Sequence, residues 1–301
     1  MYLNAPVART SAADEFQLLE IANGNFVHIG HFPPLNSQNQ GDIANIGFIV
    51  GEKCIAVIDT GSSIAVGQKL KAAIGRVSKL PICAVVITHV HPDHLLGLNA
   101  FGSDPGIVFY GHHRLPRQIK ARYRYYLESV RQELNLGEPE KYLIDNEIFK
   151  TIKNTVRIDL GNRILEIKAW GHAHTDHDLT IMDKKTETFW AGDIVTSEHV
   201  PILDSNARGY LEVTKRLKEL NPKKYVVGHG DFKRPWGEVI AAQEEYITVL
   251  IDETRLALKN NVSLMDAVNV IGWGERHKWR NFDRYHRRNV TTTYTDLEWE
   301  D

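Results

Sequence analysis

Thr88-His89-Val90-His91-Pro92-Asp93-His94 places three imidazoles and a carboxylate within six consecutive residues, directly after the apolar run 82–87. That run predicts a buried strand, so the polar cluster follows the end of the strand. In an extended segment the rings of His89 and His91 leave the same side of the backbone and can bind one metal ion. Pro92 then turns the chain. Asp93 and His94 therefore face elsewhere, which suits a second metal about 3.5–4 Å from the first.

Three more residues of the metal-ligand type follow apolar runs that predict strands: His174, Asp193 and His229. We expect these strand ends to converge with the 89–94 cluster on one rim. His89, His91 and His174 offer one ion three neutral imidazoles and an open fourth position, which is typical of a catalytic site. A second ion would have mixed oxygen and nitrogen ligands: Asp93, His94 and His229.

His-x-His-x-Asp-His after a strand resembles the metallo-β-lactamase fold superfamily, a group of mostly dinuclear zinc hydrolases. The runs 41–51 and 56–61, with His174-Thr175-Asp176 and Ala191-Gly192-Asp193, are similar to one branch of it. That branch is the SoxH-related quinoprotein relay system zinc metallohydrolases, and the resemblance spans nearly the whole chain. It implies an α/β fold, a four-layer αβ/βα sandwich of two mixed β-sheets with helices on the outer faces.

The resemblance also implies roles for residues around the metals. Asp193 corresponds to the aspartate that bridges both ions in glyoxalase-like members. Asp59 is expected to orient the metal loop without binding metal itself. His177 stands where relatives usually carry Gly, and it is either a substrate or proton-relay contact or a surface side chain. The role of His172 is left open.

The activity implied is that of a dinuclear hydrolase with two Zn²⁺ ions, or with iron or manganese in their place. A metal-bound hydroxide would attack a small acyl substrate, namely an ester, thioester, lactone or β-lactam, and Asp93 would act as the catalytic proton acceptor. The loop 31–41 and the basic, tyrosine-rich segment 112–136 are expected to form the wall over the metals. Such a wall suits a small anionic compound whose carboxylate an arginine can hold.

Two other functions are compatible with the motif. A mononuclear iron oxygenase can carry the same His-x-His-x-Asp-His pattern. A noncatalytic binding or delivery component could serve quinoprotein dehydrogenases or their pyrroloquinoline quinone cofactor, as the name of the branch suggests. The complete set of metal-ligand residues favours catalysis.

Composition limits the partners. The formal net charge of −2 provides no electrostatic footprint for nucleic acid or a membrane surface. No run approaches 18 apolar residues, and the first residues carry no export signal. The chain is therefore expected to be soluble, cytoplasmic as written and periplasmic if a signal was removed. The oligomeric state is left open.

We expect a single domain over 1–301, because 43% hydrophobic residues can bury a large core. The aromatic tail 272–301 should pack on the body. The periodic run 236–259 predicts an amphipathic helix, and Gly161-Asn162 predicts a hairpin turn. Cys54 and Cys83 both lie in apolar runs, where packing as buried thiols is the favoured interpretation and a bridge between the two strands the alternative.

Overall fold

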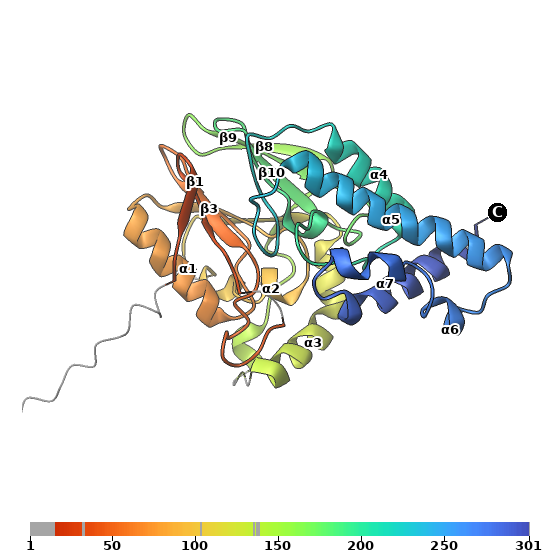
Figure 1. Ribbon diagram of the computed structural model, residues 1–301. Coiled ribbons are helices and arrows are strands. Elements are labelled where there is room, and N and C mark those ends of the chain that lie inside the picture. Colours follow the sequence, from red (N-terminus) through yellow and green to blue (C-terminus); the bar gives the residue numbers. More distant parts are fainter. Residues whose placement is uncertain (1–15, 32–33, 103, 135, 137–138, 301) are drawn as a thin grey trace, which may run out of the picture.

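The computed structural model describes residues 16–31, 34–102, 104–134, 136 and 139–300 (Figure 1). Their strands form two sheets. The seven-stranded sheet has the order β1 to β7, and the five-stranded sheet has the order β12-β11-β10-β9-β8. The strands are β1 Leu19–Ala22, β2 Asn25–His28, β3 Ile46–Val50, β4 Ile55–Ile58, β5 Ile82–Val86, β6 Val108–His112, β7 Phe149–Ile152, β8 Thr155–Asp159, β9 Ile164–Ala169, β10 Leu179–Asp183, β11 Thr188–Trp190 and β12 Lys224–Val226.

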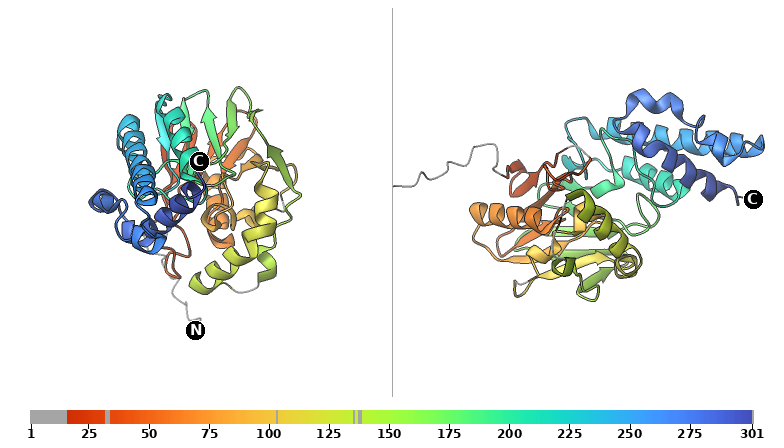
Figure 2. Two further views of the ribbon diagram at one scale, coloured as in Figure 1. Left: turned by 90° about the vertical axis from the view of Figure 1, so that its right-hand side faces the viewer. Right: turned by 90° about the horizontal axis from the view of Figure 1, so that it is seen from below.

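Helices cover the outer face of each sheet. They are α1 Ile64–Val77, α2 Pro92–Leu95, α3 Leu115–Leu134, α4 Ala207–Lys218, α5 Trp236–Lys259, α6 Leu264–Ala267 and α7 Phe282–Leu297, with the 3₁₀ turns η2 Leu98–Ala100, η3 Pro139–Tyr142, η4 Gly192–Ile194 and η5 Trp273–Lys278. In Figures 1 and 2, α1 and α3 lie on one side of the strands, and α4 and α5 lie on the other.

Both sheets are mixed. In the first sheet β1 to β4 pair antiparallel, and β4 to β7 pair parallel. In the second sheet β8 to β11 pair antiparallel, and β12 joins β11 in parallel. The parallel pairs need long connections, and α1 supplies the one between β4 and β5. This arrangement confirms the predicted fold class.

Three buried apolar clusters separate the layers. The middle cluster packs side chains of both sheets together, including Ile58, Val86, Ile167 and Ile181. A second cluster lies under α1 and α3, and a third lies under α4, α5 and α7. The two sheets therefore bury their inner faces against each other, and each buries its outer face under helices.

Several local predictions are confirmed. Helix α5 covers the predicted range 236–259. The turn Gly161-Asn162 joins β8 to β9, and both residues have positive φ, 89° and 49°, as a tight hairpin requires. Within the tail, the described residues 272–300 include η5 and α7, and Phe282, Val290 and Leu297 of α7 pack with α4 and α5. The assignment of the whole chain to one domain stays a prediction.

The favoured interpretation of the cysteines was wrong. Cys54 and Cys83 form a disulfide, with their Cα atoms 5.8 Å apart. Cys54 immediately precedes β4 and Cys83 lies in β5, which is its parallel neighbour. Apolar sequence around each thiol predicted burial correctly for Cys54, but it carried no information on the distance between them.

The helices also bear on the membrane. In the described part of the chain, none of the helices combines the length and apolar character needed to cross a bilayer.

Candidate metal centre

The metal loop begins where β5 ends, and a buried carboxylate fixes its course. Oδ1 of Asp59, just after β4, accepts the Thr88 main-chain N–H at 2.8 Å. Oδ2 of Asp59 accepts the Thr88 hydroxyl at 2.8 Å. Because β4 and β5 are parallel neighbours, both strand ends reach the same rim, and Pro92 then starts α2 as its first residue.

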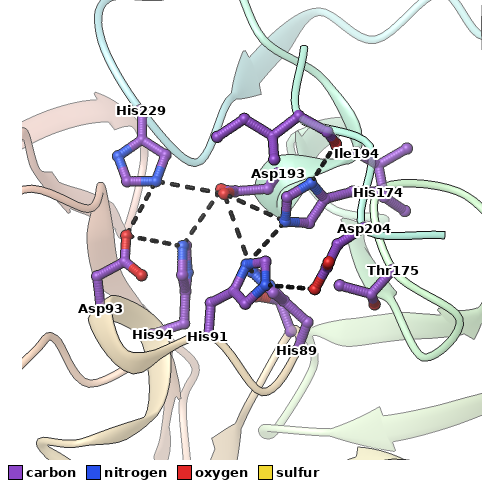
Figure 3. Close-up of polar contacts among 12 residues, drawn as sticks. His89, His91, Asp93, His94, His174, Thr175, Asp193, Ile194, Asp204 and His229 are labelled. Atoms are coloured by element: carbon purple, nitrogen blue, oxygen red, sulfur yellow. Dashed lines mark hydrogen bonds and ion pairs between the residues drawn. The ribbon is translucent and has the colours of Figure 1, made fainter. Parts of the chain in front are cut away.

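The first group consists of His89, His91 and His174, whose ligand atoms also lie within 4.8 Å of a carboxylate oxygen of Asp193 (Figure 3). Nδ1 of His91 lies 3.0 Å from Nε2 of His89 and 2.9 Å from Nε2 of His174. One nitrogen of each of the three rings thus lies close to the other two, within the reach of a single metal ion. The opposite nitrogen of each ring has a protein partner: Oγ1 of Thr88 for His89, Oδ2 of Asp204 for His91 and the carbonyl of Ile202 for His174.

The second group consists of Asp93, His94 and His229. Nε2 of His229 lies 3.0 Å from Oδ2 of Asp93, and Nε2 of His94 lies 3.6 Å from the same oxygen. The outer nitrogens are again held, since Nδ1 of His229 is 2.8 Å from the carbonyl of Ile43 and Nδ1 of His94 is 2.8 Å from Oδ2 of Asp59. Such partners fix the tautomer and the ring orientation of a metal-binding histidine.

Asp193 lies between the two groups. Its Oδ1 is 3.2 Å from Nε2 of His94, and its Oδ2 is 3.6 Å from Nε2 of His174 and 3.3 Å from Nε2 of His229. The carboxylate fits tightly against the chain at Gly228, because a Cβ there would lie 1.7 Å from Oδ1. Glycine at position 228 therefore makes room for Asp193.

Two buried atoms in this centre indicate that a cation fits it. Nε2 of His94 and Oδ1 of Asp193 lie 3.2 Å apart without the geometry of a hydrogen bond, and neither has a hydrogen-bond partner elsewhere within the described residues, although both are buried. Buried polar atoms without partners are rare in folded proteins and need an explanation. Imidazole nitrogens and carboxylate oxygens, each supported from behind, form a set suited to divalent metal ions.

The charges of the centre point the same way. Burial and the neighbouring imidazoles hold the pKa of His89 well below its ordinary value, and burial lowers the pKa of His174 to about 3. These rings therefore stay neutral, which is the metal-binding form. Burial alone would also lower the pKa of His229, but the carboxylates of Asp193 and Asp93 outweigh it and raise that pKa to about 10. The second group thus attracts positive charge.

A family model agrees with this architecture. The model of the metallo-beta-lactamase superfamily matches residues 39–229, a range that contains both groups. The chain belongs to the metallo-β-lactamase superfamily. The narrower SoxH-related branch stays a prediction.

Solved structures of the superfamily share the fold at low sequence identity. A metallo-beta-lactamase from Pontibacter korlensis superposes with a TM-score of 0.59 at 17% identity, covering 77% of this chain and 98% of its own. The structure of TMB-1 gives 0.59 at 19%, covering 77% and 96%. The inverting sec-alkylsulfatase Pisa1 from Pseudomonas sp. gives 0.71 at 15%, covering 94% of this chain and 50% of its own.

One curated relative matches in sequence. A linear primary-alkylsulfatase from Pseudomonas sp. (strain ATCC 19151) is 42% identical over 50 residues, or 17% of this chain. The match spans only a tenth of the length of that relative.

The His177 side chain is buried, and both of its ring nitrogens have partners within the protein. Its side chain is 1% exposed, so it is not a surface residue. Nε2 accepts the Val90 main-chain N–H at 3.2 Å, and Nδ1 lies 2.7 Å from Oδ1 of Asp176. Since both ring nitrogens are in use behind the metal loop, His177 positions the loop between His89 and His91. His172 is exposed and pairs with Ser205.

Two carboxylates that hold the metal-ligand histidines or their loops were not predicted from the sequence. Asp204 lies beyond His174 in the sequence and reaches Nε2 of His91 at 3.1 Å. Asp178 accepts both the main-chain N–H and the hydroxyl of Thr175, which fixes the loop that carries His174. Only Asp178 had a local signal, because a Thr-x-x-Asp spacing is typical of a turn closed by a side chain.

The open side of the centre is formed by His91 and Asp93, whose side chains are each 14% exposed, compared with 7% or less for the other five. Helices α3 and α7 border this opening. Tyr126 of α3 stands edge-on to His91, with ring centroids 5.7 Å apart. Tyr285 of α7 lies against His199, which in turn contacts His229. Residues of α3 and α7 therefore lie beside the more exposed side of the centre.

Proposed function

We propose that this protein is a metal-dependent hydrolase that uses two zinc ions to cleave a small acyl substrate. The single observation that carries the proposal is the pair of adjoining ligand groups with Asp193 between them. Every imidazole in these groups has its outer nitrogen held by the protein. Sites prepared in this way are typical of catalytic metal centres.

Metal ions bound in the two groups would polarise the substrate oxygen and lower the pKa of a water molecule toward neutrality. The protein's own side chains position the reactants and move the proton. His91 and Asp93 form the accessible side, so the scissile bond lies over them. Asp93 is the carboxylate on this side, and we assign to it the acceptance of the proton from the attacking water and its return to the leaving group.

An acyl substrate is supported by the wall of the opening. Tyr126 and Tyr285 offer rings for an apolar body, and Arg122 and Arg288 lie beside the opening on Asp204. A combination of rings and guanidinium groups suits a compact molecule that carries a carboxylate. We therefore propose an ester, thioester, lactone or β-lactam with an anionic group.

A sulfate ester is the second candidate substrate. The observation that favours it is the 42% identity over 50 residues to a linear primary-alkylsulfatase. Metal ions held by the same two groups would also suit cleavage of a sulfate ester, because both reactions need a polarised substrate oxygen and an oriented water molecule.

The disulfide supports one of the two compartments considered for the protein. Disulfides persist in oxidising compartments and are rare where thiols are kept reduced. The Cys54–Cys83 bond therefore favours the bacterial periplasm or a similar environment.

The experiment that tests the function compares substrates side by side on protein loaded with zinc. Nitrocefin, a small lactone, a thioester, a long-chain alkyl sulfate and a phosphodiester are offered at equal concentration, and metal content is measured on the same sample. We expect two metal ions per chain and turnover of an acyl substrate. Preference for the alkyl sulfate would select the second candidate. No turnover of any of the five substrates would indicate a noncatalytic binding or delivery component.

A further inference from the structure

Two arginines from distant parts of the chain meet on one carboxylate beside the first group of histidines. Arg122 lies in α3 and Arg288 lies in α7. Nη1 of Arg122 donates to Oδ2 of Asp204 at 2.8 Å, and Nη2 of Arg288 donates to Oδ1 of the same carboxylate. Two positive charges share one negative charge, so the cluster keeps a surplus of positive charge.

This cluster is joined to the metal centre through a single atom. Oδ2 of Asp204, which accepts from Arg122, also lies 3.1 Å from Nε2 of His91. The Tyr126 hydroxyl approaches the same oxygen at 3.5 Å while its ring stands edge-on to His91. The carboxylate of Asp204 therefore lies between the Arg122 guanidinium and His91 of the first group.

A cavity of about 530 Å³ opens over the arginines. It is lined by Ala121, Arg122, Tyr125, Tyr126 and Arg288. None of these lining residues is acidic, and the Tyr125 side chain is largely exposed, so its ring is available to cover a ligand. The volume is in the range of small-molecule sites. The cavity thus combines two phenol rings with two cations.

Each of the two guanidinium groups has N–H donors that make no hydrogen bond to the described residues. A guanidinium has five N–H donors. Toward the described residues, Arg122 uses only Nη1, which donates to Asp204 and Tyr126, and Arg288 uses only Nη2. The Nε and remaining Nη groups of each arginine have no protein acceptor in that part of the chain. They can therefore bind an anion without breaking the bonds to Asp204.

We propose that Arg122 and Arg288 form a subsite for a carboxylate of the substrate, placed away from the bond that is cleaved. This subsite selects monoanionic acyl compounds over neutral ones, and it rests on the proposed hydrolase function. One carboxylate matches the surplus charge and can bind a guanidinium through two parallel hydrogen bonds. The family-model match ends at residue 229, so Arg288 belongs to a part of the chain outside it.

The kinetic test uses two esters with six-carbon acyl groups and one leaving group: 4-nitrophenyl hexanoate, which is neutral, and the mono-4-nitrophenyl ester of adipic acid, which is anionic. We expect kcat/KM of the zinc-loaded protein to be higher for the anionic ester. Arg288→Gln should lower the ratio of kcat/KM for the anionic ester to kcat/KM for the neutral ester about 10- to 100-fold, mainly through KM of the anionic ester. Arg122→Gln should act in the same direction.

Arg287→Gln is the matched control, because it removes the same charge from the same helix. The Arg287 side chain donates to Asn269 and lies over Trp273, away from the cavity. It should leave the preference between the two esters as in the wild type. Equal loss in Arg287→Gln and Arg288→Gln would show a general charge effect and overturn the subsite, as would an unchanged preference in Arg288→Gln.

A binding measurement separates the subsite from the hydrolase function. Sodium hexanoate is titrated by calorimetry into chelator-treated protein, so that no metal competes for the carboxylate. We expect binding to the wild type and to Arg287→Gln, and at least about 10-fold weaker binding to Arg288→Gln. If neither ester is hydrolysed, the proposed function fails while the titration still tests the subsite. No binding to the wild type, or equal binding to all three proteins, would overturn it.

Discussion

Oδ2 of Asp59 lies 2.8 Å from Nδ1 of His94, while Nε2 of His94 faces Asp93 and Asp193. The same carboxylate accepts two hydrogen bonds from Thr88, and Asp59 itself has a left-handed backbone with φ of 56°. Asp tolerates this conformation better than most side chains. One buried carboxylate thus connects the ends of β4 and β5 and sets the orientation of the His94 ring.

Asp59→Asn should weaken zinc binding about 10- to 100-fold while the fold is retained. The reason is that both Asp59 oxygens accept hydrogen bonds, and the amide presents an N–H group to one of these donors. Competition with a chromophoric chelator measures the affinity. Asp145→Asn, at an exposed turn where Oδ1 accepts the Glu147 N–H, is the control and should bind zinc like the wild type. Equal affinity in both variants would remove Asp59 from this role.

Asp93→Ala should lower kcat/KM by more than about 100-fold and reduce the metal content from two ions per chain toward one. The side chain lies in α2 next to His94 and is partly exposed, so its removal leaves no core cavity. Metal analysis and steady-state kinetics give the two readouts. An unchanged melting temperature of the chelator-treated variant serves as the control for folding. Turnover at the wild-type rate would exclude Asp93 from the mechanism.

Arg163→Met should destabilise the fold by about 3–5 kcal/mol, because it leaves the buried carboxylate of Asp183 without its cation. Arg163 lies after the β8–β9 turn and also donates to the carbonyls of Asn23 and Val50, so it ties the two sheets together. Urea denaturation measures the free energy of unfolding. Arg157→Met, which removes an exposed ion pair with Glu166, is the control and should cost less than about 1 kcal/mol.

The same pair predicts a sign for the pH dependence. Burial raises the pKa of Asp183, but the bonds from Arg163, Thr186 and Asn25 outweigh it and hold that pKa below its ordinary value. In the wild type this contribution is therefore present above about pH 4, the pKa of an unfolded Asp, and is lost as the pH falls through the folded value. In Arg163→Met only burial and three neutral donors remain, namely Asn25, Thr186 and the Lys185 main-chain N–H, so the difference in stability between the proteins should shrink toward low pH.

Replacement of both Cys54 and Cys83 by Ala should lower the free energy of unfolding by about 3.5 kcal/mol, as expected for a cross-link that closes a loop of this length. The two cysteines are 29 residues apart, and the loop between them contains α1 and Asp59. Urea denaturation of the wild type with and without a reducing agent gives the comparison. The double variant, which has no bond to reduce, is the control. A wild type insensitive to reduction would contradict this estimate.

The ligand residues that lie close together in the sequence could be predicted from their spacing. His89, His91, Asp93 and His94 lie within one loop, and strand patterns indicated where His174, Asp193 and His229 would meet them; the structure brings all seven together. Contacts between distant segments had no such signal. Asp204 reaches His91 across 113 residues, and Arg288 reaches Asp204 across 84. Likewise, one extra imidazole at position 177 gave no indication of whether it faced the opening or the back of the loop.

Two regions of the chain border the opening over the centre, one inside and one outside the range of the family model. The loops that carry the seven ligand residues lie within the range of the family model, whereas α7, with Tyr285 and Arg288, follows it. Substitutions at Tyr285 or Arg288 would therefore alter the wall of the opening while the seven ligand residues stay the same. Two proteins with identical metal residues can then differ in their substrates, and the last helix, rather than the histidine motif, is the region in which to compare them.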